Sequence, residues 1–236
     1  AELCASALKL AAAAHYTHAG TVEFLMDADT GKFYFIEVNP RIQVEHTVTE
    51  AITGIDIVKA QIRIAEGHAI GSEESGVPQQ ADIAMRGHAV QCRVTSEDPE
   101  NNFIPDYGAI TAYRSPAGFG IRLDAGTAYV GARITRYYDS LLVKITAWAN
   151  SPEEVSQRML RALREFRIRG VSTNLRFLIG LHENPQFRRA EYTTRFIDET
   201  PELLVFARRR DRASRLLRFI GEVAVNGNPA VKGRAQ

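Results

Sequence analysis

The sequence predicts an α+β protein, and three features carry this prediction. An Ala- and Leu-rich helical stretch comes first, followed by two short strands that a polar loop joins. From residue 83 onward the chain changes to short strand candidates separated by Gly and Pro, which is typical of an antiparallel sheet. A helix with clear start signals then begins near residue 151.

The first part of the chain is predicted to hold two helices and a hairpin. The first helix stops near Gly20, and the second has Gly67 in the place of a helix stop. A polar, turn-rich stretch without periodicity then marks a boundary. The predicted ranges are 3–16 for the first helix, 21–26 and 33–38 for the strands, 53–67 for the second helix and 71–82 for the boundary.

The second part is predicted to form a sheet and then helices. Ser151 is the expected N-cap of a helix, with Pro152 at its first position and Glu154 completing a capping box. Gly170 is expected to end this helix. The other predicted elements are strands in "IAMRGHAVQCRV", "GAITAYRS", "GIRLD" and "LLVKITAWA", a helix over about 174–182, a basic helix over 201–220 and a strand in "EVAVNGNP".

The hairpin is expected to bring two carboxylates together. If its strands pair in register around the loop, Glu23 lies opposite Glu37, and Asn39 projects from the same face. Like charges facing each other across strands are unfavourable. Two carboxylates and an amide oxygen are hard ligands suited to Mg²⁺ or Mn²⁺, and Mg²⁺ usually completes its shell with nucleotide phosphates. Leu25 and Phe35 would share this face and could pack on an adenine ring.

The segment after the hairpin, "NPRIQVEH", adds further polar side chains. Arg41, Gln43 and Glu45 alternate, so an extended segment would point a cation, an amide and a carboxylate to one side. Such a set could hold a small anion and remove its proton. The alternative is an amphipathic hairpin whose glutamates are merely solvated.

The stretch "FIEVNPRIQVEHTVTE" resembles the signature of biotin carboxylases, a branch of the ATP-grasp superfamily. The resemblance continues through "GHAVQCRVTSEDP", "FIPDYGAIT", "GFGIRLD" and "YYDSLLVK". It implies the C-terminal half of an ATP-grasp lobe, followed by an antiparallel-sheet-plus-helices biotin carboxylase C-terminal domain. The implied division is 1–70 and 71–200 for these two parts, and 201–236 for a basic helix and linker.

The resemblance implies carboxylation of biotin with ATP and bicarbonate, through carboxyphosphate, with the biotin carried on a separate carrier domain. Arg93 matches the arginine that stabilises the enolate of biotin, and Arg41 could help to hold that oxyanion. Glu45 matches the general base that deprotonates bicarbonate. The other implied roles are metal–nucleotide ligation by Glu23, Glu37 and Asn39, an adenine contact by Leu25, bicarbonate binding by Arg41, Gln43 and the Val44 backbone, and dimer contacts by Phe119 and Arg122.

The extension after about residue 200 resembles the pyruvate carboxylases, in which it leads through a linker to a carboxyltransferase domain. The implied reaction is the first half of making oxaloacetate from pyruvate. The implied assembly is a homo-oligomer that dimerises through this domain and is tetrameric overall. Arg167, Arg169 and Arg212 match a site for the activator acetyl-CoA, and a solvated basic face is the alternative.

The composition argues against several other classes. A formal charge of +1 gives no general attraction for nucleic acid or membranes, and no apolar run approaches the roughly 20 residues that span a bilayer. Two cysteines without a CxxC motif argue against a disulfide scaffold or a zinc ribbon. We expect a bacterial cytoplasmic location, or the mitochondrial matrix if the source is eukaryotic.

The sequence has no Gly-rich loop of the kind that ATP-grasp enzymes place over nucleotide phosphates, and it has no initiator Met. We therefore expect a piece of a longer chain that is catalytically incompetent alone. Two alternatives stay open. One is another ATP-grasp ligase, such as an acyl-CoA carboxylase or a carbamoyl-phosphate-type enzyme. The other is a non-catalytic fragment that dimerises.

Overall fold

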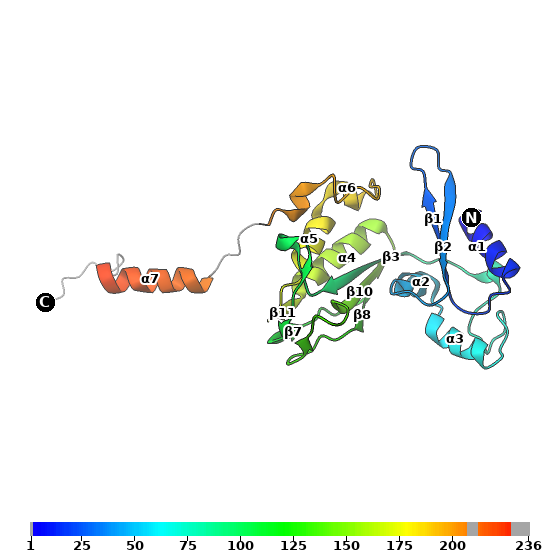
Figure 1. The fold of residues 1–236 in the computed structure, drawn as a ribbon, viewed down its shortest axis with the longest axis horizontal. Helices are drawn as coiled ribbons and strands as arrows, with labels where there is room; N and C mark the ends of the chain where they lie inside the picture. Colours follow the sequence, from blue (N-terminus) through cyan, green and yellow to red (C-terminus); the bar gives the residue numbers. More distant parts are fainter. Residues whose placement is uncertain (1, 207–211, 228–236) are drawn as a thin grey trace. The chain divides into compact units, whose positions relative to one another are not determined.

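The fold is known from a computed structural model that describes residues 2–206 and 212–227. The chain divides into two compact units, Ala1–Leu204 and Val205–Gln236. The first unit mixes helices with small antiparallel sheets, in agreement with the predicted α+β class (Figure 1). Its α-helices are α1 (Glu2–Ala13), α2 (His46–Thr53), α3 (Ile57–Ala65), α4 (Pro152–Glu165), α5 (Leu175–Glu183) and α6 (Pro185–Arg188), with 3₁₀ turns at Gln80–Asp82, Pro99–Asn101 and Pro201–Leu204.

The strands of the first unit form five separate sheets among the described residues. The hairpin β1–β2 and the three-stranded sheet β3-β10-β8 are the larger ones, and the other sheets are short pairs. The strands are β1 (Thr21–Met26), β2 (Phe33–Asn39), β3 (His88–Thr95), β4 (Glu97–Asp98), β5 (Ile104–Pro105), β6 (Gly108–Ala109), β7 (Ala112–Arg114), β8 (Ile121–Ala125), β9 (Arg133–Ile134), β10 (Leu141–Ala149) and β11 (Arg167–Arg169).

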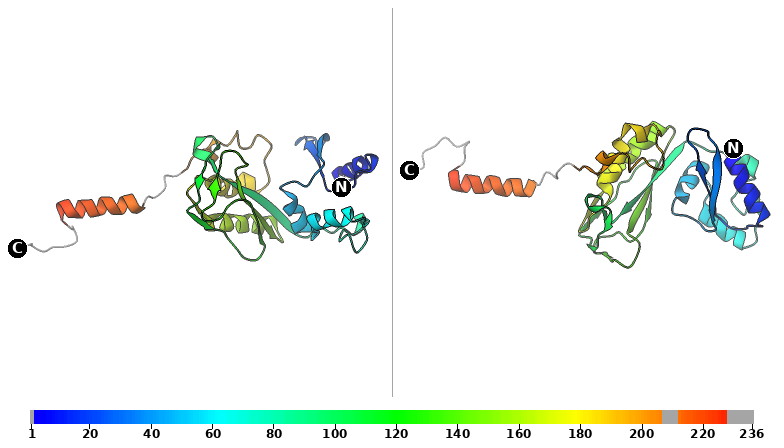
Figure 2. Two further views of the ribbon diagram at one scale, coloured as in Figure 1. Left: turned by 60° about the horizontal axis from the view of Figure 1, so that its bottom comes forward. Right: turned by 45° about the horizontal axis from the view of Figure 1, so that its top comes forward.

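The sheet β3-β10-β8 has two faces of different chemistry. Val143, Ile145 and Ala147 of β10 are fully buried on one face, against which α4 packs. Helix α4 lies along these strands in both views of Figure 2. Because alternate residues point to opposite faces, Lys144 and Thr146 lie on the other face with their cross-strand partners. These partners are Arg93 and Gln91 on β3, and Asp124 and Arg122 on β8.

Helix α4 supplies the main helical contribution to the core. Its start is the predicted one: Ser151 Oγ accepts a hydrogen bond from the Glu154 amide at 3.3 Å, and Pro152 occupies the first helical position. Val155 and Met159, one turn apart, are 1% and 0% exposed. Burial of each such side chain contributes about 1.5–3 kcal/mol to folding. An apolar stripe at helical spacing therefore fixes α4 to the sheet.

Two early helices differ from the prediction. Helix α1 ends at Ala13, before residue 16, because His15 adopts a left-handed φ of 50°. The range 53–67 does not form one helix. The unpredicted helix α2 ends at Thr53 because Gly54 is left-handed (φ 74°), and Asp56 then starts α3 by accepting from the Lys59 amide at 2.8 Å.

The predicted end of α4 at Gly170 is also wrong. The helix ends at Glu165, and β11 then pairs with β7. Phe166 is the residue at which the backbone leaves the helix and becomes extended. Gly170 instead forms a tight turn with φ 103°, where an added Cβ would lie 1.9 Å from the Ala109 carbonyl oxygen. The turn requires glycine for both reasons.

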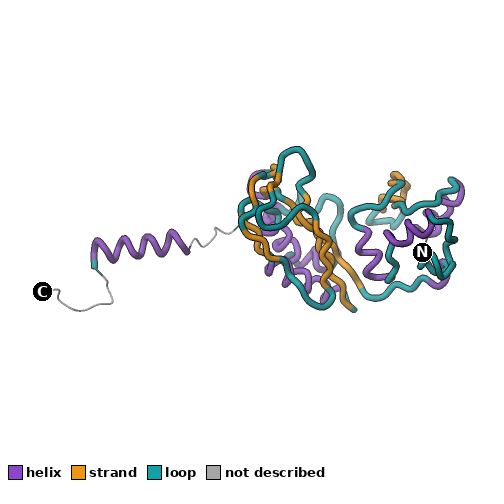
Figure 3. The backbone as a smooth tube through the Cα atoms, turned by 90° about the horizontal axis from the view of Figure 1, so that it is seen from below, coloured by secondary structure: helices purple, strands orange, loops and turns teal. Residues whose placement is uncertain are grey.

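The second unit contains helix α7 (Arg212–Asn226), which is continuous in Figure 3. The strand predicted in "EVAVNGNP" is therefore wrong over its described part. Val223 and Val225 favour a strand by propensity, but propensity is a weak prior, and the helix that begins at Arg212 continues through both residues. Gly227 (φ 78°) ends the helix by donating to the Val223 carbonyl at 2.9 Å. Arg208, Arg209 and Arg210 of the predicted basic helix lie outside the described residues.

Candidate active site

The hairpin sets two glutamates face to face. Glu23 is the direct cross-strand partner of Glu37, as the sequence predicts. The Asn39 Nδ2 donates to Glu23 Oε1 at 2.8 Å and to Glu37 Oε1 at 3.1 Å. Gln43 Nε2 lies 3.1 Å from the same Glu23 oxygen. In this state the amide N–H groups of Asn39 and Gln43 offset the repulsion between the carboxylates.

The donor chemistry of this cluster fits a hard divalent cation. A half-turn of the Asn39 amide would present Oδ1 in place of Nδ2, so that three oxygens could meet one ion. Gln43 Oε1, next to the cluster, is buried and has no hydrogen-bond partner. The described residues contain no group of three or more His, Cys, Asp or Glu side chains placed so that they could hold a metal ion. The metal hypothesis for this region therefore depends on two carboxylates and an amide.

The apolar side of the hairpin differs from the prediction. A register shift after Glu23 pairs Leu25 with Tyr34 and Phe24 with Phe35. The Phe35 ring accordingly meets Phe24 edge to face, with ring centroids 6.3 Å apart. Phe35 therefore does not share the face of Leu25 and Glu23. Leu25, which is 52% exposed, therefore lies on the face of Glu23 as predicted, but without Phe35 beside it.

The segment after the hairpin is not the extended run that the alternating pattern predicts. The Arg41 amide bonds the Asn39 carbonyl at 2.8 Å, and residues 44–45 form a turn that leads into α2. Arg41 Nη1 donates to the Ile42 carbonyl at 3.2 Å, whereas Gln43 reaches back to Glu23. Arg41, Gln43 and Glu45 thus have separate partners, because the backbone turns between them.

Glu45 and Arg93 form an ion pair across a long sequence separation. Arg93 Nη2 lies 2.8 Å from Glu45 Oε2, and both side chains are about half exposed. Arg93 projects from β3, and Glu45 is the residue that precedes the first turn of α2. The structure thus brings together the expected general base and the expected oxyanion-binding arginine.

A cavity of about 560 Å³ lies beside this ion pair. Val44 and Arg93 line one part of it, and polar and aromatic side chains line the rest. The Arg136 guanidinium stacks 4.8 Å from the centre of the Tyr107 ring at its wall. The other lining residues include Thr95, Ser96, Glu97, Tyr138, Asp139 and Ser140.

The two expected dimer residues lie in different surroundings. Phe119 is 82% exposed and touches the Trp148 ring edge to face. Arg122 is bound within its own chain: Nη1 lies 2.5 Å from Glu50 Oε2, and Asp124 accepts from Nε and Nη2. The hydrogen bonds that Arg122 donates to Asp124 are the largest cause that raises the pKa of Arg122.

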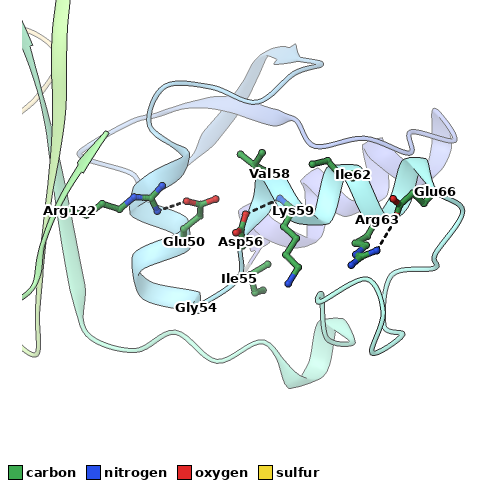
Figure 4. A pocket seen from close by; sticks show the side chains of 10 residues that line it. All are labelled: Glu50, Gly54, Ile55, Asp56, Val58, Lys59, Ile62, Arg63, Glu66 and Arg122. Carbon is green, nitrogen blue, oxygen red and sulfur yellow. Dashed lines mark hydrogen bonds and ion pairs between the residues drawn. The ribbon is translucent and has the colours of Figure 1, made fainter. Parts of the chain in front are cut away.

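Arg122 and Glu50 line a cavity of about 780 Å³, together with helix α3 (Figure 4). Val58 and Ile62 of α3 are 46% and 56% exposed at this cavity. Figure 4 shows that the Arg122–Glu50 pair joins the sheet to α2 at one end of the cavity. The sequence offers no simple signal for this pairing because 72 positions separate the two residues.

The residues expected at an activator site lie in both units. Arg167 and Arg169 are exposed at the two ends of β11, opposite Arg114 and Ala112 of β7. Arg212 is the first residue of α7, and its side chain lies outside the described part of the chain.

Sequence reasoning missed the buried and partly buried polar residues that hold the Glu45 turn. Gln91 and Lys144 both bond the Val44 carbonyl, and Thr47 is fully buried. A usable signal existed in the strands, where Gln91 and Lys144 interrupt apolar runs at alternate positions. Polar side chains in such a pattern predict a sheet face that packs against other polar groups.

Comparisons with known proteins bear on this site. The model of the biotin carboxylase C-terminal domain matches residues 91–199. The model of the carbamoyl-phosphate synthase L chain, ATP binding domain, matches residues 1–73. The chain is 52% identical over 230 residues to pyruvate carboxylase of Bacillus subtilis, a match that covers 98% of this chain and 20% of that protein. The chain thus spans about one fifth of the length of the curated relatives that it matches.

Two solved structures extend the comparison. A variant of Rhizobium etli pyruvate carboxylase, solved with the allosteric activator acetyl coenzyme-A, is 68% identical with a TM-score of 0.90; the match covers all of this chain and 23% of that one. The biotin carboxylase domain dimer of Hydrogenobacter thermophilus 2-oxoglutarate carboxylase, in complex with MgADP, ADP and bicarbonate, is 43% identical with a TM-score of 0.80. That match covers 85% of this chain and 43% of that one. The predicted fold, part of an ATP-grasp lobe followed by a biotin carboxylase C-terminal domain, is confirmed.

Proposed function

This chain belongs to the pyruvate carboxylase family, within its biotin carboxylase region, and from that premise we propose that it takes part in the ATP- and bicarbonate-dependent carboxylation of biotin. The reaction runs through carboxyphosphate and is the first half of making oxaloacetate from pyruvate. The facing pair of Glu23 and Glu37, with Asn39 bridging them, carries the proposal. A purely structural hairpin has no need of two opposed carboxylates.

Glu23, Glu37 and Asn39 would hold the Mg²⁺ or Mn²⁺ that accompanies ATP. When bound, the cation neutralises the charge that develops on the transferred phosphoryl group. Each glutamate contributes a full negative charge, and the amide contributes a neutral oxygen. Leu25, exposed on β1, offers an apolar surface to the adenine ring.

Arg41, Gln43 and the Val44 backbone would bind bicarbonate. A guanidinium fork matches the two oxygens of a carboxylate-like anion better than an ammonium does. Gln43 has an unpartnered buried oxygen that can accept a hydrogen bond from the bicarbonate hydroxyl. Glu45, two residues further along the chain, removes a proton from the bound anion as general base.

Arg93 would stabilise the negative oxygen of the acceptor. Its guanidinium pairs with Glu45 at 2.8 Å and borders the 560 Å³ cavity, which is large enough for a small organic group. Its fixed positive charge can stabilise a negative oxygen that develops on an acceptor bound in this cavity.

The relatives are longer than this chain, and the next proposals concern its domain division and the domains that would work with it. We assign residues 1–70 to the ATP-grasp part, 71–200 to the C-terminal domain and 201–236 to the linker; the family matches at 1–73 and 91–199 support this division. Biotin would arrive on a carrier domain, and a carboxyltransferase domain would follow the linker.

The proposed assembly and regulation follow from the same relatives. The Hydrogenobacter thermophilus domain is a dimer, and we propose contacts through Phe119 and Arg122 in a tetrameric enzyme. We propose Arg167, Arg169 and Arg212 as contacts for acetyl-CoA phosphates, since the Rhizobium etli enzyme binds that activator.

A bacterial cytoplasm is the proposed location. No helix in the described ranges is long and apolar enough to cross a membrane.

Steady-state kinetics of the full-length protein test the function. The expected result is ATP cleavage that requires both bicarbonate and biotin, and oxaloacetate formation when pyruvate is present. Arg93→Ala should lower kcat for biotin carboxylation about a hundredfold, as removal of an oxyanion-binding donor does. Arg195→Ala, which removes an exposed arginine that pairs with Glu199, is the matched control. Cleavage of ATP that ignores biotin and bicarbonate would overturn the proposal.

A further inference from the structure

Side chains on the polar face of the sheet β3-β10-β8 hydrogen-bond to the turn that carries Glu45. Lys144 Nζ lies 3.1 Å from the Val44 carbonyl oxygen and 2.9 Å from His46 Nε2. Gln91 Nε2 adds a second donor to the same carbonyl at 2.8 Å. One amine therefore bridges the residues on either side of Glu45.

These contacts fix the state of the His46 ring. A lysine ammonium only donates, so His46 Nε2 accepts and the ring proton resides on Nδ1. That atom lies 3.2 Å from Glu50 Oε1, whose side chain is 7% exposed, but the geometry is not that of a hydrogen bond. Glu50 is itself anchored by Arg122 at 2.5 Å and by the Ile57 amide at 2.9 Å. The Lys144–His46 hydrogen bond thus lies beside the ion pair of Glu50 and Arg122, and Glu50 is on the same face of α2 as His46.

The presence of a cationic side chain at position 144 calls for a physical explanation. It is only partly exposed, and Arg93 lies directly across the strand pair from it. Burial lowers the pKa of Lys144, an effect that the Asp124 and Glu50 carboxylates oppose and Arg122 and Arg93 reinforce. Packing alone would be served better by an apolar side chain. The two directed hydrogen bonds on either side of Glu45 supply that explanation.

We propose that Lys144 is a positioning residue for the reaction, which fixes the turn 44–46 so that the Glu45 carboxylate meets both Arg93 and the bound anion. The proposal rests on the proposed function. Lys144 touches neither reacting group itself, and it acts through the Val44 carbonyl and the His46 ring. The C-terminal sheet thereby sets the geometry of a base that belongs to the ATP-grasp part.

Lys144→Met removes the ammonium and keeps an unbranched apolar side chain that is one atom shorter. In the full-length protein we expect kcat for biotin-dependent ATP cleavage to fall about tenfold to a hundredfold, since misplacement of a catalytic group by about 1 Å has effects of this size. The KM for ATP should stay within about twofold, because Lys144 makes no contact with the metal cluster. Lys32→Met, at an exposed position in the hairpin loop, is the matched control and should be silent.

A double-variant cycle separates positioning from a general structural role. If Lys144 acts through Glu45, adding Lys144→Met to Glu45→Gln should cost less than about a further twofold. The same tenfold or larger loss in both backgrounds would overturn the proposal, because the effect would then not pass through Glu45. A kcat of Lys144→Met within about twofold of the wild type would overturn it as well.

Hydrogen exchange gives a readout that does not depend on activity. The His46 amide bonds the Gln43 carbonyl at 3.2 Å, and the Val48 amide bonds the Glu45 carbonyl at 3.1 Å. Lys144→Met should speed exchange at these two amides about tenfold, while Lys32→Met leaves them unchanged. Unchanged exchange would overturn the positioning role even in an active enzyme. An inactive wild-type protein with faster exchange in Lys144→Met would instead overturn the proposed function and leave the contact standing.

Discussion

At the scale of single residues, the sequence allowed the prediction of chemical types and of one contact. Glu23 and Glu37 pair as expected because a short polar loop between two short strands leaves few registers. Glu45 and Arg93 could be predicted as functional residues but not as neighbours. Their ion pair depends on how α2 packs on the sheet, which no local pattern encodes.

The buried pair of Cys92 and His182 gives a residue-scale prediction on stability. Cys92 Sγ lies 3.3 Å from His182 Nε2, and burial raises the pKa of the Cys92 thiol to about 12. Burial lowers the pKa of His182, which is 1% exposed, to about 4 from an unfolded value near 6.5. Both groups are therefore neutral in the folded chain at pH 7.

The direction of the pH effect follows from this depressed pKa of His182. Between pH 6.5 and 4 the unfolded chain binds a proton at His182 that the folded chain does not. The free energy of unfolding should therefore fall as the pH drops through this window, by up to about 3 kcal/mol. Urea unfolding of wild type and His182→Leu at pH 7, 6 and 5 checks this. Parallel losses in the two proteins would contradict it.

At the scale of elements, propensity and capping predicted most helices and strands, and left-handed residues account for the errors at the ends of α1 and α2. The start of α4 follows from Ser151 and Pro152, and β10 follows from its apolar run. The break between α2 and α3 depends on Gly54 and Asp56, whose stop and start signals lie inside one apolar pattern. The register shift of the hairpin has no sequence signal, because it depends on how Phe24 meets Phe33 and Phe35.

Two glycines give an element-scale prediction with an internal control. Gly170→Ala should lower the melting temperature strongly, because its φ is 103° and the new Cβ would clash with the Ala109 carbonyl. Gly180→Ala lies within α5 and meets nothing within 4 Å, so it should stabilise by up to about 1 kcal/mol. Thermal unfolding followed by circular dichroism distinguishes the two. Equal effects of both substitutions would show that the turn at Gly170 is not as described.

At the scale of the whole molecule, the relatives are about five times longer than this chain. The chain would contribute the proposed metal-binding hairpin, the proposed bicarbonate turn and the arginine beside it, but its sequence has no Gly-rich phosphate loop. We therefore predict that the 236-residue chain alone releases no phosphate from ATP, with or without bicarbonate and biotin. A phosphate-release assay against the full-length protein checks this. Sustained bicarbonate-dependent release by the chain alone would refute it.

The central claim is that a nucleotide-bound metal ion is the reason why Glu23 and Glu37 oppose each other. A crystal structure of the full-length protein with MgADP tests it most directly. The account predicts a Mg²⁺ ion bonded to oxygens of both glutamates at about 2.0–2.1 Å, with Asn39 Nδ2 turned away from them. A structure with bound MgADP whose metal lies elsewhere, while Asn39 Nδ2 still bridges the two carboxylates, would contradict it.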